Sequence, residues 1–133
     1  MSVVPGEPLQ IGLWLAHDPG WHTYWLNPGD SGLPTRIELD LPPGVEAGPI
    51  RWPIPERLPA GPLVNFGYSG TMVLPLALAV PADFPDDTLV IRARADWLIC
   101  EVECIPGDGE YTLMLPVTGA TAPPSRWSEY FAA

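Results

Sequence analysis

Positive charge is scarce in this sequence, which limits the partners that the chain can have. Six Lys and Arg residues stand against sixteen Asp and Glu residues, and the formal net charge is -10 at pH 7. A surface with this balance repels polyanions such as nucleic acid. We therefore predict no nucleic-acid partner and expect a soluble, acidic surface.

Long apolar runs are also missing. No stretch reaches the length of about 18 apolar residues that a membrane helix needs, and the start Met1–Gly6 has neither a basic n-region nor an apolar h-region. We expect no direct membrane insertion of this chain. Met1 fits either a native start or an expression start that replaces a removed signal peptide.

Windows long enough for a helix are few, because 19 Pro and 13 Gly residues are spread over the 133 positions. One short helix is predicted over Pro123–Phe131, with Ser125 as its cap. The remaining pattern is made of short alternating segments, which favours a single all-β domain, a β-sandwich, over residues 1–133.

The alternating segments predict the strands. They are Leu9–Leu15, Thr35–Leu41, Met72–Val80 and Leu89–Ile99. Pro75 predicts a bulge or an edge position in its strand, and the four prolines of Ile50–Pro62 predict an extended connection or edge.

Only two cysteines occur, Cys100 and Cys104, and they follow the clearest strand. The alternation of that strand puts Cys100 on its polar side, at a strand end where a partner can reach it. Ile105–Gly109 is predicted to be a turn, after which Tyr111–Val117 resumes the period of two. The cysteines should therefore lie near the tip of a β-hairpin.

Four roles are open for this pair on residue type and spacing: a structural disulfide, a redox pair, two buried thiols, or half of a metal site. The metal role has the least support, because His17 and His22 lie far away in sequence. A structural disulfide would close a loop of about five residues, worth about 2 kcal/mol, and short exposed disulfides tend to be labile. We predict no metal and no cofactor.

Acidic residues surround the pair in sequence. Asp96, Glu101 and Glu103 disfavour a thiolate, while the nearest cations, Arg92 and Arg94, lie further back on the strand. We expect exchange to begin when the thiolate of a partner attacks this disulfide.

Aromatic residues gather in two segments beside loops. His22, Tyr24 and Trp25 precede a loop rich in Gly, Asn and Asp, and Phe66 and Tyr68 lie among glycines. Core packing and a place at a site are both open for these rings. We predict that His22, Tyr24 and Trp25, together with Glu101 and Glu103, line the site of the cysteines.

Five segments carry a resemblance to a known family. They are Gly20–Trp25, Asn27–Gly32, Asn65–Tyr68, Trp97–Cys100 and Cys104–Pro106, and they span most of the chain in the family's order. The chain resembles the N-terminal periplasmic domain of DsbD-type thiol:disulfide interchange proteins, in particular the ScsB-like branch. The best-known DsbD members have five residues between their cysteines and this chain has three, so its hairpin tip must differ.

The resemblance implies an immunoglobulin-like β-sandwich in which Cys100 and Cys104 are the redox pair and Asn65, Phe66, Gly67 and Tyr68 form a cap loop over them. It also implies a periplasmic domain of an inner-membrane protein in a Gram-negative bacterium. The implied partners are a thioredoxin-like domain and a transmembrane domain of the same full-length protein, and periplasmic thioredoxin-fold or peroxiredoxin-type proteins. The rival interpretation is a non-catalytic β-sandwich for binding or adhesion, in which the disulfide is structural.

Overall fold

The computed structural model describes residues 2–118, and over this range the chain forms β-strands joined by turns and loops. The predicted helix at Pro123–Phe131 lies outside the described residues. The strands are β1 (Pro8–Ala16), β2 (Thr23–Gly29), β3 (Arg36–Asp40), β4 (Glu46–Ala47), β5 (Glu56–Ala60), β6 (Leu63–Tyr68), β7 (Thr71–Ala79), β8 (Thr88–Cys100) and β9 (Cys104–Pro116).

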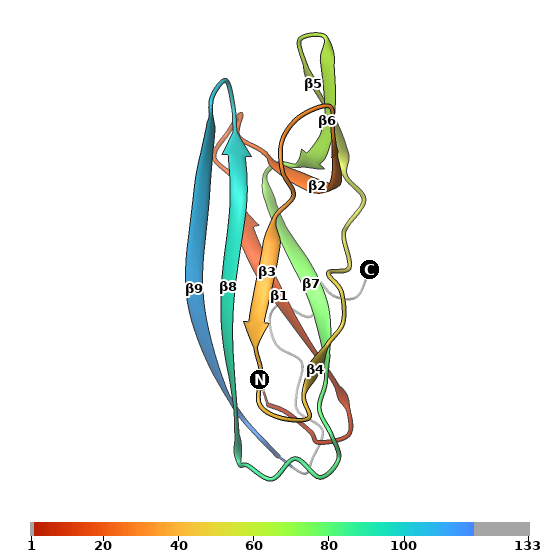
Figure 1. Cartoon of the computed structure of the whole chain (residues 1–133), viewed down its shortest axis with the longest axis vertical. Coiled ribbons are helices and arrows are strands. Elements are labelled where there is room, and N and C mark those ends of the chain that lie inside the picture. The colour runs from red at the N-terminus through yellow and green to blue at the C-terminus, as the bar shows by residue number, and fades with distance from the viewer. Residues whose placement is uncertain (1, 119–133) are drawn as a thin grey trace.

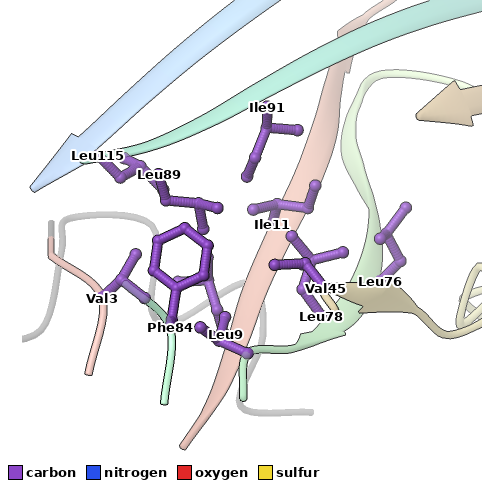
Figure 2. Packing of buried hydrophobic residues seen from close by; sticks show 11 residues of the cluster. Val3, Leu9, Ile11, Val45, Leu76, Leu78, Phe84, Leu89, Ile91 and Leu115 are labelled. Carbon is purple, nitrogen blue, oxygen red and sulfur yellow. The ribbon is translucent and has the colours of Figure 1, made fainter. Parts of the chain in front are cut away.

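The strands form three antiparallel sheets with the orders β1-β7-β4, β3-β8-β9 and β2-β6-β5 (Figure 1). The first two face each other and bury the apolar residues of the alternating segments between them. Figure 2 shows this core, to which the two sheets contribute Leu9, Ile11, Leu76, Leu78, Leu89, Ile91 and Leu115. The predicted all-β sandwich is confirmed.

The third sheet, β2-β6-β5, lies at the end of the molecule where the β8–β9 hairpin has its tip (Figure 1). It is joined to β8 through a bridge in which His22 pairs with Cys100. The predicted edge character of Ile50–Pro62 is confirmed, since β5 is the outer strand of this sheet and, within residues 2–118, pairs only with β6.

Pro75 lies in β7, the central strand of its sheet, and the register between β1 and β7 runs through it without a bulge, so the predicted bulge or edge position is wrong. Its carbonyl oxygen accepts a hydrogen bond from the Arg51 backbone N–H at 2.8 Å, on the side away from β1. The nitrogen of a strand residue faces the same side as its oxygen, so the missing N–H of Pro75 removes no bond to β1.

The turn predicted at Ile105–Gly109 is wrong. The turn of the hairpin is Glu101–Glu103, and Ile105–Gly109 belongs to β9. The N–H and C=O of Cys100 form hydrogen bonds with His22, on the side away from β9. The pair of Cys100 with Cys104 is therefore not hydrogen-bonded across β8 and β9, and the same holds for every second pair after it. Pro106 is in such a pair, so its nitrogen points away from β8 and the strand tolerates it.

Candidate functional site

Cys100 and Cys104 form a disulfide across the tip of the β8–β9 hairpin, with their Cα atoms 4.1 Å apart. The two residues are directly opposite in the register of the strands. The backbone N–H of Glu101 donates to the carbonyl oxygen of Glu103 at 3.0 Å and closes the turn between them. The predicted position of the pair near a hairpin tip is confirmed.

The two cysteines differ sharply in exposure. Cys100 is 2% exposed, whereas Cys104 is exposed. Cys100 has β9 on one side and His22 on the other, and the backbones of His22 and Cys100 exchange two hydrogen bonds of 3.0 Å. The prediction that a partner can reach Cys100 is therefore wrong, because Cys100 is buried and a neighbouring segment at His22 pairs with its backbone.

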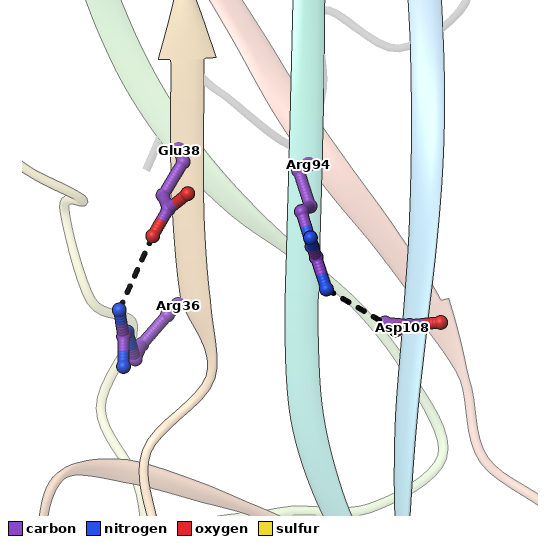
Figure 3. A network of polar contacts seen from close by, with 4 residues as sticks. All are labelled: Arg36, Glu38, Arg94 and Asp108. Atoms are coloured by element: carbon purple, nitrogen blue, oxygen red, sulfur yellow. Dashed lines mark hydrogen bonds and ion pairs between the residues drawn. The ribbon is translucent and has the colours of Figure 1, made fainter.

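The turn between the cysteines carries exposed acidic side chains, Glu101 and Glu103. The carboxylate of Glu101 lies over Gly20, where an added Cβ would be 2.7 Å from Oε2. Arg94, further along β8, forms an ion pair with Asp108 at 3.5 Å (Figure 3). The charged residues nearest to the cysteines in sequence are carboxylates, which disfavour a thiolate.

The predicted aromatic lining lies at the start of β2: Tyr24 and Trp25 belong to the strand, and His22 directly precedes it. Tyr24 is buried, and its ring meets the His22 ring edge to face with centroids 5.3 Å apart. Trp25 is half-buried and makes a similar contact with Phe66 at 6.2 Å. Tyr24 and Trp25 are consecutive residues of β2, so the two ring contacts lie on opposite faces of the strand.

Burial shifts two ionisable groups in this region. Burial lowers the pKa of His22 below its ordinary value, the nearby His17 lowers it further, and Glu56 opposes the shift. Burial also raises the pKa of Tyr24. Both groups are held in their neutral forms near pH 7, so His22 adds no positive charge that would stabilise a thiolate beside it.

The residues predicted as a cap loop, Asn65–Tyr68, form the second half of β6. β6 pairs with β2 on one side and β5 on the other. Gly67 does not adopt a positive φ, and an added Cβ would clash with the carbonyl oxygen of Thr23. This glycine allows the backbones of β6 and β2 to approach closely.

Asn65 and Tyr68 are anchored by side-chain hydrogen bonds. Asn65 is buried, and its Oδ1 accepts from the backbone N–H of Ser31 at 2.9 Å and from its hydroxyl at 3.1 Å. The hydroxyl of Tyr68 donates to the carbonyl oxygen of Pro53 at 2.8 Å, and its ring stacks on Trp52.

Sequence reasoning missed Ser31 and Trp52 as supports of this strand. Ser31 acts on a residue 34 positions away in sequence. Only the presence of a polar Asn65 among aromatic residues signals that such a partner exists.

Residues 2–118 contain neither a metal-binding cluster nor a membrane-spanning helix. In that range no cluster of three or more His, Cys, Asp and Glu side chains could hold a metal ion. The same residues contain no helix long and apolar enough to cross a membrane.

The fold and the site define a class: an all-β domain with one asymmetric disulfide at a hairpin tip. A family model described as "Thiol:disulfide interchange protein DsbD, N-terminal" matches residues 1–116, and the chain belongs to that family. None of the curated proteins compared with the chain matches it.

Among solved structures, the chain is similar to the N-terminal periplasmic domain of ScsB from Proteus mirabilis. The TM-score is 0.63 at 25% sequence identity, over 86% of this chain and 43% of that chain. The likeness confirms the immunoglobulin-like fold and the resemblance identified from the sequence. The chain spans less than half of the solved domain that it matches.

Proposed function

We propose that this chain is the thiol:disulfide exchange module of a periplasmic electron relay. It accepts two electrons from a thioredoxin-like domain and uses them to reduce disulfides of periplasmic proteins. The thioredoxin-like domain in turn receives its electrons from a transmembrane domain of the same full-length protein. The observation that carries the proposal is the disulfide with one buried and one exposed cysteine, in a chain of the DsbD N-terminal family.

Cys104 is the sulfur that meets partners. When the electron donor reduces this domain, a thiolate of the donor attacks Cys104 Sγ. The Cys100–Cys104 bond breaks, and Cys100 leaves as a thiolate that takes up a proton. A second partner thiol resolves the mixed disulfide and leaves both cysteines reduced. When the reduced domain acts on its target, the Cys104 thiolate attacks a disulfide of the protein to be reduced. Cys100 then attacks Cys104, which re-forms the Cys100–Cys104 disulfide and releases the reduced protein.

The cap is assigned to Asn65, Phe66, Gly67 and Tyr68. β6 lies in the sheet that adjoins Cys100, and the β5–β6 hairpin is at the same end of the molecule as the cysteines (Figure 1). The aromatic side chain of Phe66 then limits the access of small oxidants to the reduced pair. Proteins of the thioredoxin fold and peroxiredoxins, whose cysteines are accessible, are the partners that fit this site.

The test is the redox equilibrium of the cysteine pair with glutathione buffers, followed by mass measurement after alkylation. A relay pair equilibrates within the range of these buffers, whereas a structural disulfide stays oxidised. A pair that resists even excess dithiothreitol would overturn the relay and favour the non-catalytic binding domain.

A further inference from the structure

The face of the β3-β8-β9 sheet that carries the disulfide also carries a groove of about 460 Å³. Side chains of every second opposed pair in a hairpin share one face. From the tip downward, these pairs are Cys100 with Cys104, Leu98 with Pro106, and Asp96 with Asp108. The last two pairs line the groove, so it begins one row below the disulfide.

The groove changes character along its length. Its end near the disulfide is apolar, formed by Leu98, Pro106 and the loop residue Leu33, which is 64% exposed. Its far end is charged and holds two carboxylates, Asp96 and Asp108.

A single cation, Arg36, stands among the side chains that line the groove. It is opposite Asp96 in the sheet and forms an ion pair with Glu38 at 3.2 Å (Figure 3). Asp108 meets Arg94 at 3.5 Å, and both ion pairs are more than half exposed, so they neutralise the far end only weakly. The groove is therefore apolar next to the sulfurs and acidic beyond them.

We propose that this groove binds the extended segment next to the reactive cysteine of the partner protein. The segment carries an apolar side chain two residues from that cysteine and a Lys or Arg four residues from it. The proposal rests on the proposed function and adds the sequence class of the partner. Two observations select this occupant: the groove begins at the pair Leu98 and Pro106, one row from the exposed Cys104, and its acidic end, on a chain of net charge -10, complements a cation.

The spacing follows from strand geometry. An extended segment rises about 3.3 Å per residue, as do β8 and β9, so its residues two and four positions from the cysteine come level with the next two rows. The apolar residue then lies over Leu98 and Pro106, and the cation lies beside Asp96 and Asp108. Once the partner thiolate has attacked Cys104, the mixed disulfide fixes this register.

The test uses the complete 133-residue chain in its oxidised form and two capped peptides with one thiol each. The first peptide has the sequence Cys-Gly-Leu-Gly-Lys. The second has Ser and Glu in place of the Leu and Lys. Both are also made in reversed order, because the segment can run in either direction. Two peptide thiols reduce one protein disulfide and become a peptide disulfide, and the rate is followed by alkylation and mass measurement.

We expect the leucine and lysine peptide, in one of its two directions, to react about five- to tenfold faster than its counterpart. Leu33→Ser should remove the share of this rate advantage that comes from the leucine of the peptide. Asp108→Asn should remove the share that comes from its lysine. Met114→Ser and Asp40→Asn are matched controls, since both residues are exposed and lie outside the groove. Added salt should weaken only the effect of lysine.

Equal rates for all peptides, with normal reduction by dithiothreitol, would overturn the groove and leave the proposed function standing. An advantage that persists in Leu33→Ser and Asp108→Asn would overturn the groove as well. A disulfide that dithiothreitol does not reduce would overturn the proposed function itself, so the two failures are distinguishable.

Discussion

Cys100 and His22 exchange two backbone hydrogen bonds of 3.0 Å each, although 78 positions separate them in the sequence. This bridge places Cys100 between two neighbouring strand segments, while Cys104, on the edge strand β9, is exposed. The same bridge joins the cysteine hairpin to the sheet that contains Phe66. One backbone contact therefore makes the two sulfurs unequal and ties them to the proposed cap.

The unequal exposure predicts which cysteine forms mixed disulfides. Cys100→Ala leaves the exposed Cys104, which should accumulate a stable mixed disulfide with a thioredoxin-fold protein because no second thiol resolves it. Cys104→Ala leaves only the buried Cys100 and should trap little. The measurement is the yield of complex on non-reducing gels, and a complex retained only when Cys104 is absent would reverse the assignment.

Gly67→Ala tests the close packing of β6 on β2. An added Cβ would clash with the carbonyl oxygen of Thr23 and lie about 3.0 Å from the Cα of Tyr24, both of which are backbone atoms that cannot rotate away. We expect a loss of about 2 to 3 kcal/mol in the free energy of unfolding, measured by denaturant titration.

Gly48→Ala is the matched control for this substitution. Its added Cβ would meet only the carbonyl oxygen of Ala77, at an ordinary contact distance of 3.5 Å, and its φ is not positive. A change of less than about 1 kcal/mol is expected there. If Gly67→Ala cost no more than Gly48→Ala, the two backbones would not be packed as closely as described.

His22 predicts a pH dependence of stability. Burial holds its pKa below the ordinary value of 6.5, and His17 lowers it further. The unfolded chain therefore takes up a proton near pH 6.5, while the folded chain does so only at lower pH. Between these values the unfolded state binds more protons, so this contribution to the free energy of unfolding falls as pH decreases through 6.5.

His22→Gln should remove that contribution. We expect the melting temperature of the wild-type chain to fall more than that of the variant between about pH 7.5 and pH 5. Thermal melts followed by circular dichroism at intervals across this range provide the measurement. Parallel curves for the two proteins would show that His22 titrates in the folded state as it does in the unfolded chain.

The strands and the hairpin were predictable because alternation and proline placement are local signals. The predicted Leu89–Ile99 became β8, Thr88–Cys100, and Thr35–Leu41 contains β3, Arg36–Asp40. The burial of Cys100 was not predictable, because it depends on a bridge to His22, a contact that no local pattern encodes.

The turn was misplaced for a different reason. Gly107 and Gly109 resemble turn residues in the sequence, but they lie in β9 beneath the rings of Trp97 and Tyr111, where an added Cβ would clash with the ring atoms. A glycine that makes room for an aromatic ring in a sheet and a glycine that makes a turn have the same local signature. Only the pairing of β8 with β9 distinguishes them.

Phe66 is the residue that defines the proposed cap, and its test needs a control residue of similar burial on the same strand whose side chain is not aromatic. Phe66 and Val64 are both half-buried, and they lie two residues apart on one face of β6. Phe66 contacts Trp25 edge to face, and neither residue belongs to the main core cluster. Truncation of either side chain should therefore leave the fold intact.

Phe66→Ala should cost about 1 to 2 kcal/mol in the free energy of unfolding, below the roughly 3 to 5 kcal/mol lost when a core Phe is truncated. If the ring of Phe66 shields the reduced pair, the same change should speed alkylation of the pair by iodoacetamide severalfold, because the aromatic cover is then removed. Val64→Ala should lose similar stability without this gain in rate. Melting transitions and alkylation rates of both variants are the measurements. A large loss of stability with unchanged thiol reactivity would identify Phe66 as a packing residue and would rule out the cap.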